Sequence, residues 1–450
     1  MKKILFTSII ILSSLSTFAQ IVDIPDENFK AALLDNFLPI DTNGDGEIQV
    51  SEAELAPNIN AILNDVTDIT GIEAFINLEV LSLGNNEITT VNLSQNTKLR
   101  VLAIDVNPIT DIDLSFLPDL EIVRLGQTPI QEIDLSFNPN LRRLDLDGTS
   151  IQELDLTAND NLEVLSLINT SLTTIDVSGL TELIQLSVNI AEMSEIDVSN
   201  NLLLEALNVR GSGLTSINLQ NNTNLEVLDI SFTNLQAVDL SQNTQLKILL
   251  IAGNPLESID LTDLSALRAI DIGMTDITTL DFSMNPQLCF VSVNLSENLT
   301  SVNLQNGTNE LLALDGTCEI SVFEASYGFP TGASFSQNND NLISICVDNI
   351  AFAEENFLNV PSSTEITQDC TLSTQDINTP LVAVYPNPTT DIINISQTAT
   401  KVVVYHLRGR HVYKGQDSTI SLKNLNNGLY ILRLETQEGA IMTKKIIKRS

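Results

Sequence analysis

The sequence contains few of the residues on which most enzymes and nucleic-acid-binding proteins depend. Among 450 residues there is no tryptophan, and there are two histidines and 21 lysines and arginines against 58 aspartates and glutamates. A net charge of −37 argues against binding to nucleic acid or to an anionic membrane surface. Both histidines, His406 and His411, lie near the carboxyl end, so the rest of the chain has no histidine-based triad and no H-E-x-x-H site.

Further absences narrow the class of protein. The sequence has no G-x-S-x-G motif and no P-loop. Its five tyrosines all follow the repeats described below, which weighs against sugar binding by stacked aromatic rings. A pair of carboxylates could still serve a glycosidase, because aspartate is abundant. We expect a protein that is not an enzyme. No apolar run after residue 19 approaches the roughly 20 residues of a membrane helix, so we expect no transmembrane segment.

The first 19 residues have the pattern of a secretory signal peptide. Two lysines precede an apolar run, which ends at Thr17-Phe18-Ala19 before Gln20. No cysteine follows this cleavage site, so the pattern is not that of a lipoprotein. We therefore expect export, with residues 1–19 removed.

A repeat of 21 residues occupies the middle of the chain. Each copy begins L-x-x-L-x-L, which alternates like a short strand, and continues I-x-x-[IVL]-[DN]-[LV]-[ST], which predicts a second short strand or extended segment. One copy cannot bury its own apolar face, so the copies must stack into a solenoid. The eleven copies begin at Leu78, Leu99, Leu120, Leu141, Leu162, Leu183, Leu204, Leu225, Leu246, Leu267 and Leu288.

This pattern resembles the leucine-rich repeat family, whose signature is L-x-x-L-x-L-x-x-N-x-L. Counted from the leading leucine, position nine carries Asn86, Asn107 and Asn254, and elsewhere mostly threonine or serine. Such side chains satisfy backbone groups where the chain leaves the strand, although Ala191 breaks the column. We predict an α/β leucine-rich-repeat solenoid, β-dominated, with a small helical amino-terminal cap and a separate all-β sandwich at the carboxyl end.

The composition divides the chain into six segments. Beyond the last copy, Leu299, Val302 and Leu304 lie one residue late, and no period is visible after residue 308. Before the first copy, Ile69 and Ile72 indicate a degenerate repeat. We assign residues 1–19 to the signal peptide, 20–77 to the amino-terminal cap, 78–308 to the eleven-repeat solenoid, 309–370 to its closing cap, 371–380 to a linker and 381–450 to a carboxy-terminal domain.

The amino-terminal cap contains a candidate calcium site. A helix is predicted over 25–37, with Asp26 as N-cap and Phe29, Ala32, Leu33 and Phe37 on its buried face. Residues 41–52 then match D-x-[DN]-x-[DN]-G-x5-E and resemble a single EF-hand or dockerin-type loop. The alternative is an acidic glycine-rich turn without metal. The resemblance implies a structural Ca²⁺ with ligands from Asp41, Asn43, Asp45, Glu47, Gln49 and Glu52.

Four cysteines lie late in a chain that we expect to be exported: Cys289, Cys318, Cys346 and Cys370. Three disulfide pairings are possible, and by sequence proximity we favour Cys289–Cys318 and Cys346–Cys370. Free buried thiols are the alternative. Zinc is disfavoured, because there is no C-x-x-C motif.

The carboxy-terminal domain differs from the rest in charge and pattern. Residues 381–450 have 10 basic against 4 acidic side chains, net +6, and the signal adds two lysines, which leaves −45 for residues 20–380. Short alternating segments separated by turns predict a small β-sandwich. The motifs Val384-Tyr385-Pro386-Asn387-Pro388, Leu425-Asn426-Asn427-Gly428-Leu429-Tyr430 and a basic end resemble the C-terminal sorting domain of the type IX secretion system of the Bacteroidetes. The resemblance implies interaction with that machinery and a secreted or cell-surface location, outer-membrane associated.

In leucine-rich repeats, positions three, five, seven and eight point from the concave sheet, and we expect a ligand there. Position fifteen, mostly aspartate, is either a solvated edge or a weak cation site. We expect a non-catalytic protein that binds a protein partner, such as an adhesin. The alternatives are a self-assembling surface or matrix component and, third, a carbohydrate-active enzyme. The candidate contact residues are Arg124, Arg143, Arg210, Phe232, Ile248, Leu250, Met274 and Phe290.

Overall fold

The computed structural model describes residues 20–189, 193–313, 317–322, 325–330, 332–335, 339–369, 384–385, 389–395, 399–406, 411–436 and 441–449. The chain divides into two compact units, Met1–Cys370 and Thr371–Ser450. The predicted signal peptide, the predicted linker, Ala191 and Cys370 lie outside the described residues. Among the described residues, no helix has the length and apolar character needed to cross a membrane.

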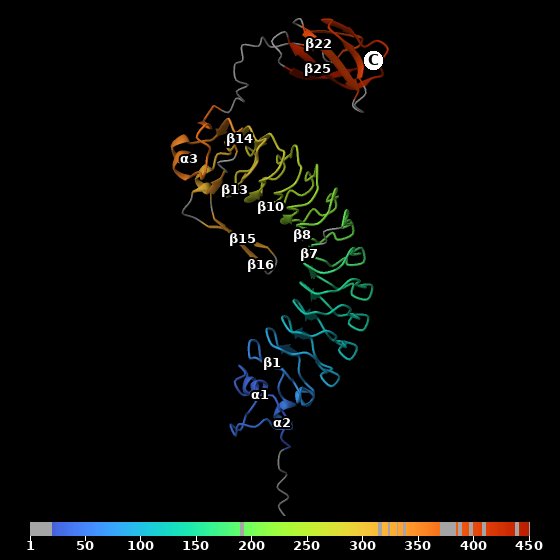
Figure 1. Cartoon of the computed structure of the whole chain (residues 1–450), viewed down its shortest axis with the longest axis vertical. Coiled ribbons are helices and arrows are strands. Elements are labelled where there is room, and N and C mark those ends of the chain that lie inside the picture. Colours follow the sequence, from blue (N-terminus) through green and yellow to red (C-terminus); the bar gives the residue numbers. More distant parts are fainter. Residues whose placement is uncertain are drawn as a thin grey trace, which may run out of the picture. The chain divides into compact units, whose positions relative to one another are not determined.

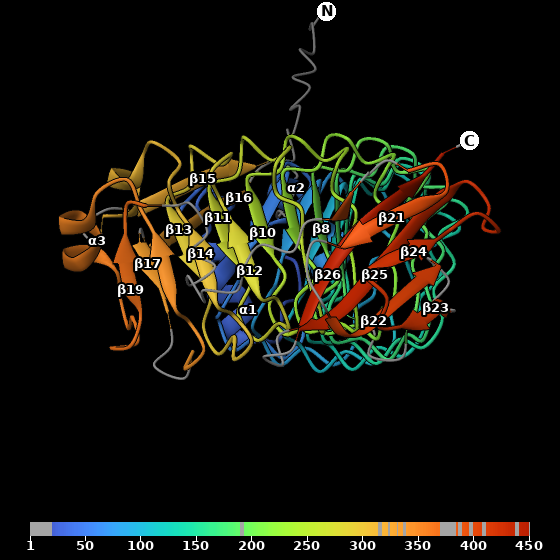
Figure 2. The same cartoon turned by 90° about the horizontal axis from the view of Figure 1, so that it is seen from above.

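The first unit is a solenoid in which every coil contributes a short parallel strand to one long sheet (Figures 1 and 2). Neighbouring strands pair 21 residues apart, as in Leu81 with Leu102 and Leu102 with Val123, because the period of the sequence is the period of the coil. The leucines of each L-x-x-L-x-L segment point into one continuous core and are almost fully buried. The fold is therefore the predicted β-dominated solenoid.

Among the described residues, 13 strands form this sheet. They are β1 (Asn58–Asn60), β2 (Val80–Ser82), β3 (Val101–Ala103), β4 (Ile122–Arg124), β5 (Arg143–Asp145), β6 (Val164–Leu167), β7 (Gln185–Val188), β8 (Ala206–Asn208), β9 (Val227–Asp229), β10 (Ile248–Leu250), β11 (Ala269–Asp271), β13 (Phe290–Ser292) and β17 (Gly332–Ser334). The strand β1 belongs to the degenerate repeat that Ile69 and Ile72 indicated. The second half of each coil is extended, and it pairs as a second sheet only in the last coils, as β12 (Thr279–Asp281), β14 (Ser301–Asn303), β18 (Ser344–Cys346) and β19 (Glu365–Thr367).

The amino-terminal cap covers the first coil with short helices. The helix α1 (Glu27–Leu34) is shorter than predicted: Asp26 caps it and Phe29 and Leu33 are buried, but it ends before Phe37, which is 94% exposed. The expectation that Phe37 packs inward was wrong, because Phe37 lies beyond the last helical turn. The helix α2 (Val50–Ala53) follows the acidic loop, and the 3₁₀ helix η1 (Ile72–Ala74) leads into β2.

The carboxyl end of the solenoid continues the coils further than the sequence indicated. Residue Leu280 pairs with Val302, 22 positions later, so the late leucines reflect one extra residue in that coil. The region expected to lack a period, residues 309–370, contributes β17, β18 and β19 to the two parallel stacks. It also holds η2 (Asn309–Leu312), α3 (Ile350–Asn356) and a hairpin of β15 (Thr317–Val322) and β16 (Ala325–Pro330).

Two columns of asparagine tie many of the coils to their neighbours. At position nine, the Asn107 side-chain amide donates to the carbonyls of Leu83 and Ile104 and accepts from the Ile88 N–H. The second column, at position nineteen, escaped the sequence analysis, although asparagine recurs there. Its amides donate to carbonyls of the preceding coil, as Asn138 does to Leu114 and Leu117 at 3.1 and 2.8 Å. The column consists of Asn96, Asn138, Asn159, Asn201, Asn222, Asn243 and Asn285, all fully buried.

The second unit consists of two antiparallel sheets around a core that includes Ile393, Val404 and Leu432. The described residues of this unit contain strands and no helix, which confirms the predicted separate all-β domain. The strands are β20 (Val384–Tyr385), β21 (Ile392–Ile395) and β24 (Thr419–Ser421) in one sheet, and β23 (His411–Gly415), β22 (Ala399–His406), β25 (Gly428–Thr436) and β26 (Ile441–Lys448) in the other.

We predict that Asn138→Ala lowers the free energy of unfolding by about 2 kcal/mol, because the carbonyls of Leu114 and Leu117 each lose one of their two donors in a buried site. Urea unfolding of the full chain measures this change. The matched control is Asn140→Ala in the same coil, because the exposed Asn140 amide also donates to a carbonyl of the preceding coil. We expect this control to stay within about 0.5 kcal/mol of the native protein. If both variants lost the same free energy of unfolding, the buried asparagine column would have no special role in stability.

Candidate functional site

The backbone of each coil turns out of the strand through a left-handed residue at position eight. Glycine and asparagine adopt this conformation most easily, and they occupy it at Asn85, Gly148, Asn169, Gly211 and Gly253. Three of the later coils place large apolar side chains there instead: Phe232, Met274 and Leu295, with φ of 56°, 54° and 57°, and Gly253 occupies the position in the coil between the first two. These three residues are called the ridge below. Their side chains remain 42%, 42% and 45% exposed, so burial does not explain why the coils carry them.

The ring of Phe232 is held in place from both sides. A Cβ added to Gly253 would lie 2.6 Å from Cδ1 of the ring, so only glycine at position 253 leaves room for it. On the other side, the guanidinium of Arg210 stands over the ring, 4.6 Å from its centroid. The ring therefore occupies one preformed position between two coils, with a cation above it.

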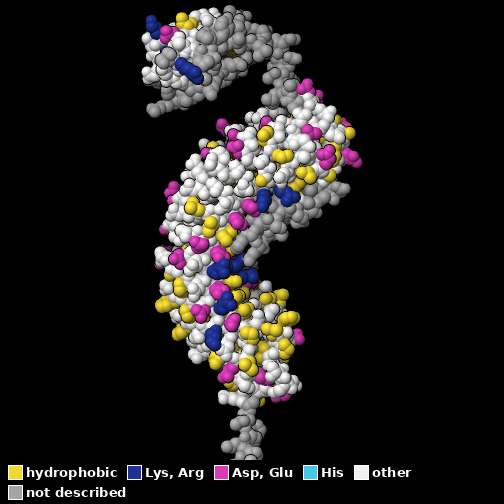
Figure 3. Space-filling model, turned by 180° about the vertical axis from the view of Figure 1, so that it is seen from behind, with side chains coloured by type: hydrophobic (Ala, Val, Ile, Leu, Met, Phe, Trp, Pro, Cys, Tyr) yellow, Lys and Arg dark blue, Asp and Glu magenta, His cyan; other side chains and the backbone are white. Residues whose placement is uncertain are grey.

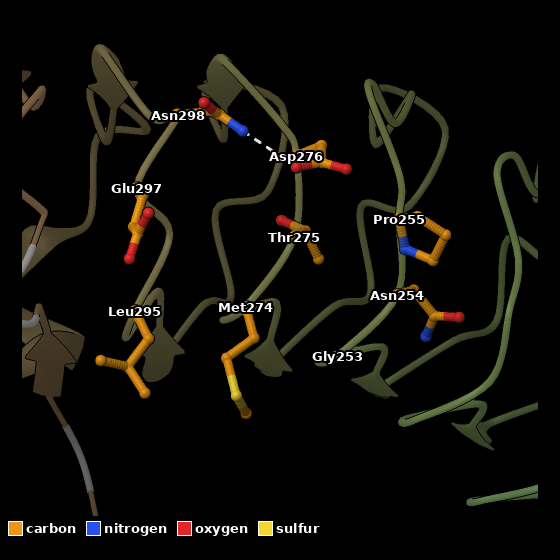
Figure 4. A pocket seen from close by; sticks show the side chains of 9 residues that line it. All are labelled: Gly253, Asn254, Pro255, Met274, Thr275, Asp276, Leu295, Glu297 and Asn298. Carbon is orange, nitrogen blue, oxygen red and sulfur yellow. Dashed lines mark hydrogen bonds between the residues drawn. The ribbon is translucent and has the colours of Figure 1, made fainter.

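A depression of about 360 Å³ lies beside the other two residues of the ridge. Figure 4 shows Met274 and Leu295 pointing in the same direction from neighbouring coils, with Asp276 and Glu297 further along the same two segments. The Asp276 carboxylate accepts from the side-chain amide of Asn298 at 2.9 Å. The depression thus combines an apolar part with two carboxylates, and it lies where the coils leave the strands.

Not all of the apolar candidates on the sheet over the last coils are exposed. Ile248 was expected to be exposed, but it has no accessible surface, and it forms a second apolar cluster with Val227, Ala269 and both Cys289 and Cys318. The hairpin β15–β16 runs along the inner side of the curved solenoid (Figure 1), and a disulfide joins Cys318 in β15 to Cys289. Cys318 therefore packs onto the concave strands here.

Leu250 and Phe290 are partly buried, and they pack against this apolar cluster. The expectation that the apolar candidates on the sheet are exposed is thereby corrected for Ile248, because no pattern in the sequence indicates which segment lies over the strands. Of the apolar candidates, Phe232 and Met274 remain accessible, at the rim of the sheet.

The candidate arginines have different surroundings. Arg124 lies between two carboxylates, 3.6 Å from Asp105 and 3.9 Å from Asp145, which neutralise it within the protein. Arg143 is half-buried, whereas Arg210 is exposed. On the face seen in Figure 3, lysine and arginine side chains gather along the middle coils among aspartates and glutamates. Only Arg210 joins the ridge.

The aspartates fall into two electrostatic classes. At position fifteen the carboxylates are exposed and accept from the N–H two residues later, as Asp113 does from Ser115 at 2.9 Å. The hydroxyl and N–H of Ser115 lower the pKa of Asp113. On the concave side, burial raises the pKa of Asp229 above its ordinary value of 3.8, although Ser231 and Arg210 act in the opposite direction. The column at position fifteen thus completes local turns.

The acidic loop in the cap is folded around its own backbone. Asp41 accepts from the N–H groups of Gly44 and Gly46 at 2.7 and 2.9 Å, and both glycines have positive φ. Asn43 and Asp45 each accept from the N–H two residues later. The loop is also attached to the start of the chain, because the Val22 N–H donates to the Ile48 carbonyl at 2.8 Å.

The last residue of the loop, Glu52, points back to the beginning of the loop. It is buried and accepts from the N–H and hydroxyl of Thr42 and from the N–H of Asn43. Burial acts to raise the pKa of Glu52, but these hydrogen bonds together lower it. Within the described residues, no three acidic, histidine or cysteine side chains form a group that could hold a metal. The donors are nevertheless all oxygens, which suits the chemistry of Ca²⁺.

The other predicted disulfide lies partly outside the described residues. Cys346 is disulfide-bonded, but Cys370 is not among the described residues, so its pairing stays a prediction.

We predict opposite pH dependences for two aspartate-to-asparagine variants. Asp229→Asn should raise the thermal midpoint at neutral pH, because the buried carboxylate is penalised in the folded state, and this gain should fade as the pH drops through the raised pKa of Asp229 towards 3.8. Asn208 accepts the equivalent N–H in the preceding coil, so the substitution preserves the turn.

The control is Asp113→Asn, at a position where Asn92 makes the same turn. It should lower the midpoint above pH 3.8, and this loss should vanish below the depressed pKa of Asp113. Differential scanning calorimetry across this range measures both variants. If both variants shifted the thermal midpoint in the same direction, the opposite pKa shifts assigned to Asp229 and Asp113 would be wrong.

Comparisons with known proteins find a family for the carboxy-terminal unit and similar structures for the solenoid. Residues 383–449 match the family model described as a secretion system C-terminal sorting domain. No curated protein matches the sequence. Among solved structures, the functional domain of InlJ from Listeria monocytogenes, described as including a cysteine ladder, has a TM-score of 0.62 and 21% identity, and the match covers 96% of this chain and 98% of that one.

An internalin, inlF, from Listeria monocytogenes is also similar, with a TM-score of 0.50, 20% identity and coverage of 79% of this chain and 99% of that one. At these identities the likeness concerns the fold alone. The chain is therefore a leucine-rich-repeat solenoid that carries a secretion-system sorting domain at its carboxyl end.

Proposed function

We propose that this chain is exported by the type IX secretion system and acts at the cell surface or in the medium as a non-catalytic protein that binds a protein partner, in the manner of an adhesin. One observation carries this proposal: the ridge of Phe232, Met274 and Leu295 exposes large apolar side chains from a backbone conformation that glycine adopts more readily. Holding such a residue in the left-handed conformation costs roughly 1–2 kcal/mol.

A binding function, rather than folding, explains why these coils keep large apolar residues in a conformation that costs free energy. Strained residues cluster at functional sites, and exposed aromatic and large apolar anchors on a rigid support are typical of protein-binding hot spots. The ridge has both properties, and Arg210 and Gly253 fix the position of its ring. Beside the ridge, the apolar strand residues Ile248 and Ala269 are buried in a cluster with Cys318 of the hairpin, whereas the ridge is exposed.

Self-assembly through the ends of the solenoid is less well supported. Such assembly needs free backbone groups on the edge strands. On β1, the side chain of Asn36 binds the Asn58 carbonyl and the Asn60 N–H. Beyond β17, Leu358 donates to the Ala333 carbonyl and accepts from the Phe335 N–H. Both ends of the long sheet are thus covered by the chain itself, which favours a binding protein over a structural polymer.

Catalysis by a pair of carboxylates is also less well supported. Inverting and retaining glycosidases place two acids on either side of a cleft that binds a sugar. The position-fifteen aspartates lie exposed on local turns, and Asp276 is already hydrogen-bonded to Asn298 beside an apolar depression. The acidic residues thus have structural roles that explain their abundance.

Calcium in the acidic loop is a second proposal about the mature protein. Asp41, Asn43, Asp45, Gln49 and Glu52 supply side-chain oxygens and Glu47 a backbone carbonyl, on a loop whose glycines already adopt positive φ. When bound, Ca²⁺ would compete with Thr42 and Asn43 for the Glu52 carboxylate. It would hold the loop between α1 and the first coil, as a structural ion.

We predict that replacing the ridge by Phe232→Gly, Met274→Gly and Leu295→Gly weakens partner capture at least tenfold. The free energy of unfolding should stay within about 1 kcal/mol of the native value, because relief of the left-handed strain offsets the chain entropy that glycine loses. Pull-down from host, bacterial and matrix extracts identifies the partner, and titration with the purified partner measures its affinity.

The matched control is Leu63→Gly, since Leu63 is also exposed and left-handed at position eight, but lies in the first coil. We expect this variant to bind normally. Undiminished capture by the triple glycine variant would rule out the ridge as the binding site, and calcium-dependent association of the protein with itself, without a partner, would favour the structural alternative.

We predict that Ca²⁺ binds to the full chain with a dissociation constant on the order of 10⁻⁴–10⁻³ M and raises its thermal midpoint. Isothermal titration calorimetry and thermal unfolding with and without chelator measure these effects. Asp41→Asn should abolish binding, because the first carboxylate of the loop is lost. Asp23→Asn, an exposed acid of the same cap outside the loop, should leave it unchanged. An identical midpoint in calcium and in chelator would overturn the proposal.

A further inference from the structure

The chemistry around the ridge restricts the class of partner more than its apolar character alone does. Gly253 lies beside the Cδ1 and Cε1 atoms of the Phe232 ring, and the Arg210 guanidinium stands over one face of it. Sugar binding by aromatic residues requires an open ring face. Because a cation occupies one face of this ring, the site suits a polysaccharide less well than a peptide that offers an acidic group to Arg210.

The two ends of the site have opposite charge. Arg210 marks one end, in the coil of β8, and its guanidinium is exposed. Asp276 and Glu297 mark the other end, in the coils of β11 and β13, and no lysine or arginine lines the depression that they border (Figure 4). Phe232 lies in the coil after that of Arg210, and Met274 and Leu295 lie in the same two coils as the acids, two positions before each of them. The site is thus positive at one end and negative at the other, with apolar side chains along its length.

The spacing of the coils gives the length of ligand that fits. From the coil of β8 to that of β13 there are four strand-to-strand steps, in the order β8-β9-β10-β11-β13. At ~4.8 Å per step the charged ends are about 19 Å apart, the length of roughly six residues of extended chain at ~3.3 Å each. A continuous peptide segment can therefore reach both ends.

We propose that the ridge binds an extended peptide segment of about six residues, with an acidic side chain at one end, apolar side chains in the middle and a basic side chain at the other end. The acidic group pairs with Arg210, and the basic group pairs with Asp276 and Glu297. This inference rests on the proposed function, since it specifies what kind of protein surface the ridge recognises.

Three synthetic peptides test the proposal, each with the same Ser-Phe-Thr-Leu-Ser centre. Their ends are Glu and Lys, Glu and Glu, or Lys and Lys, and fluorescence anisotropy measures their affinity for the full chain at low ionic strength. We expect the Glu–Lys peptide to bind about fivefold more tightly than either of the others, with the preference shrinking as salt is added. General attraction to an acidic protein would instead favour the Lys–Lys peptide.

Charge-reversal variants then test which end of the peptide binds to which end of the site. Arg210→Glu should change the preferred peptide to Lys–Lys, and the double variant Asp276→Lys and Glu297→Lys should change it to Glu–Glu. The control is Asp134→Lys, in the exposed position-fifteen column, which should keep the native preference. Equal affinities for all three peptides, no binding at millimolar concentration, or a preference that Arg210→Glu does not change would overturn this inference. A protein partner still captured through the ridge would then leave the proposed function standing.

Discussion

The structure depends on one constraint: a coil of 21 residues cannot bury its own leucines, so each coil is stable only against the next. Leucines at the first, fourth and sixth positions meet their equivalents in the neighbouring coil at full burial. The strand register, the asparagine columns and the covered ends all follow from this stacking. Asn138 binds carbonyls of the coil before it, and Asn36 closes an edge strand that has no further coil to pair with.

Because the coils stack in the same way, equivalent positions can be compared from coil to coil. Residues that the fold requires are thereby distinguished from residues that can vary. In the described coils position eight is left-handed, because the backbone turns out of the strand there. Glycine and asparagine meet this demand at little cost, so a large apolar residue at this position reveals a different requirement. The ridge is distinguished by the concentration of such residues in coils close to one another, whereas Leu63 and Val106 lie in the first coils.

The hairpin β15–β16 decides which part of the inner surface remains accessible. A solenoid of this kind normally exposes its concave strands, but here Ile248 and Ala269 are buried and the Cys289–Cys318 disulfide fixes the hairpin beside them. The accessible apolar candidates lie instead at the rim of the strands, near Arg210 and the acidic depression. The covalent attachment suits an exported protein, whose disulfides persist outside the cell.

The sequence by itself determined the coil, because a strict period places every leucine on the same side of the same strand, and it determined the separate strands of the carboxy-terminal domain by their alternation. It also paired Cys289 with Cys318 through their proximity. It could not determine that Phe37 lies beyond its helix, that Ile248 is buried or that the region after residue 308 continues the coils. Those features depend on contacts between residues distant in the chain: the hairpin reaches back over earlier coils, and Arg210, Phe232 and Gly253 meet only because three successive coils are stacked.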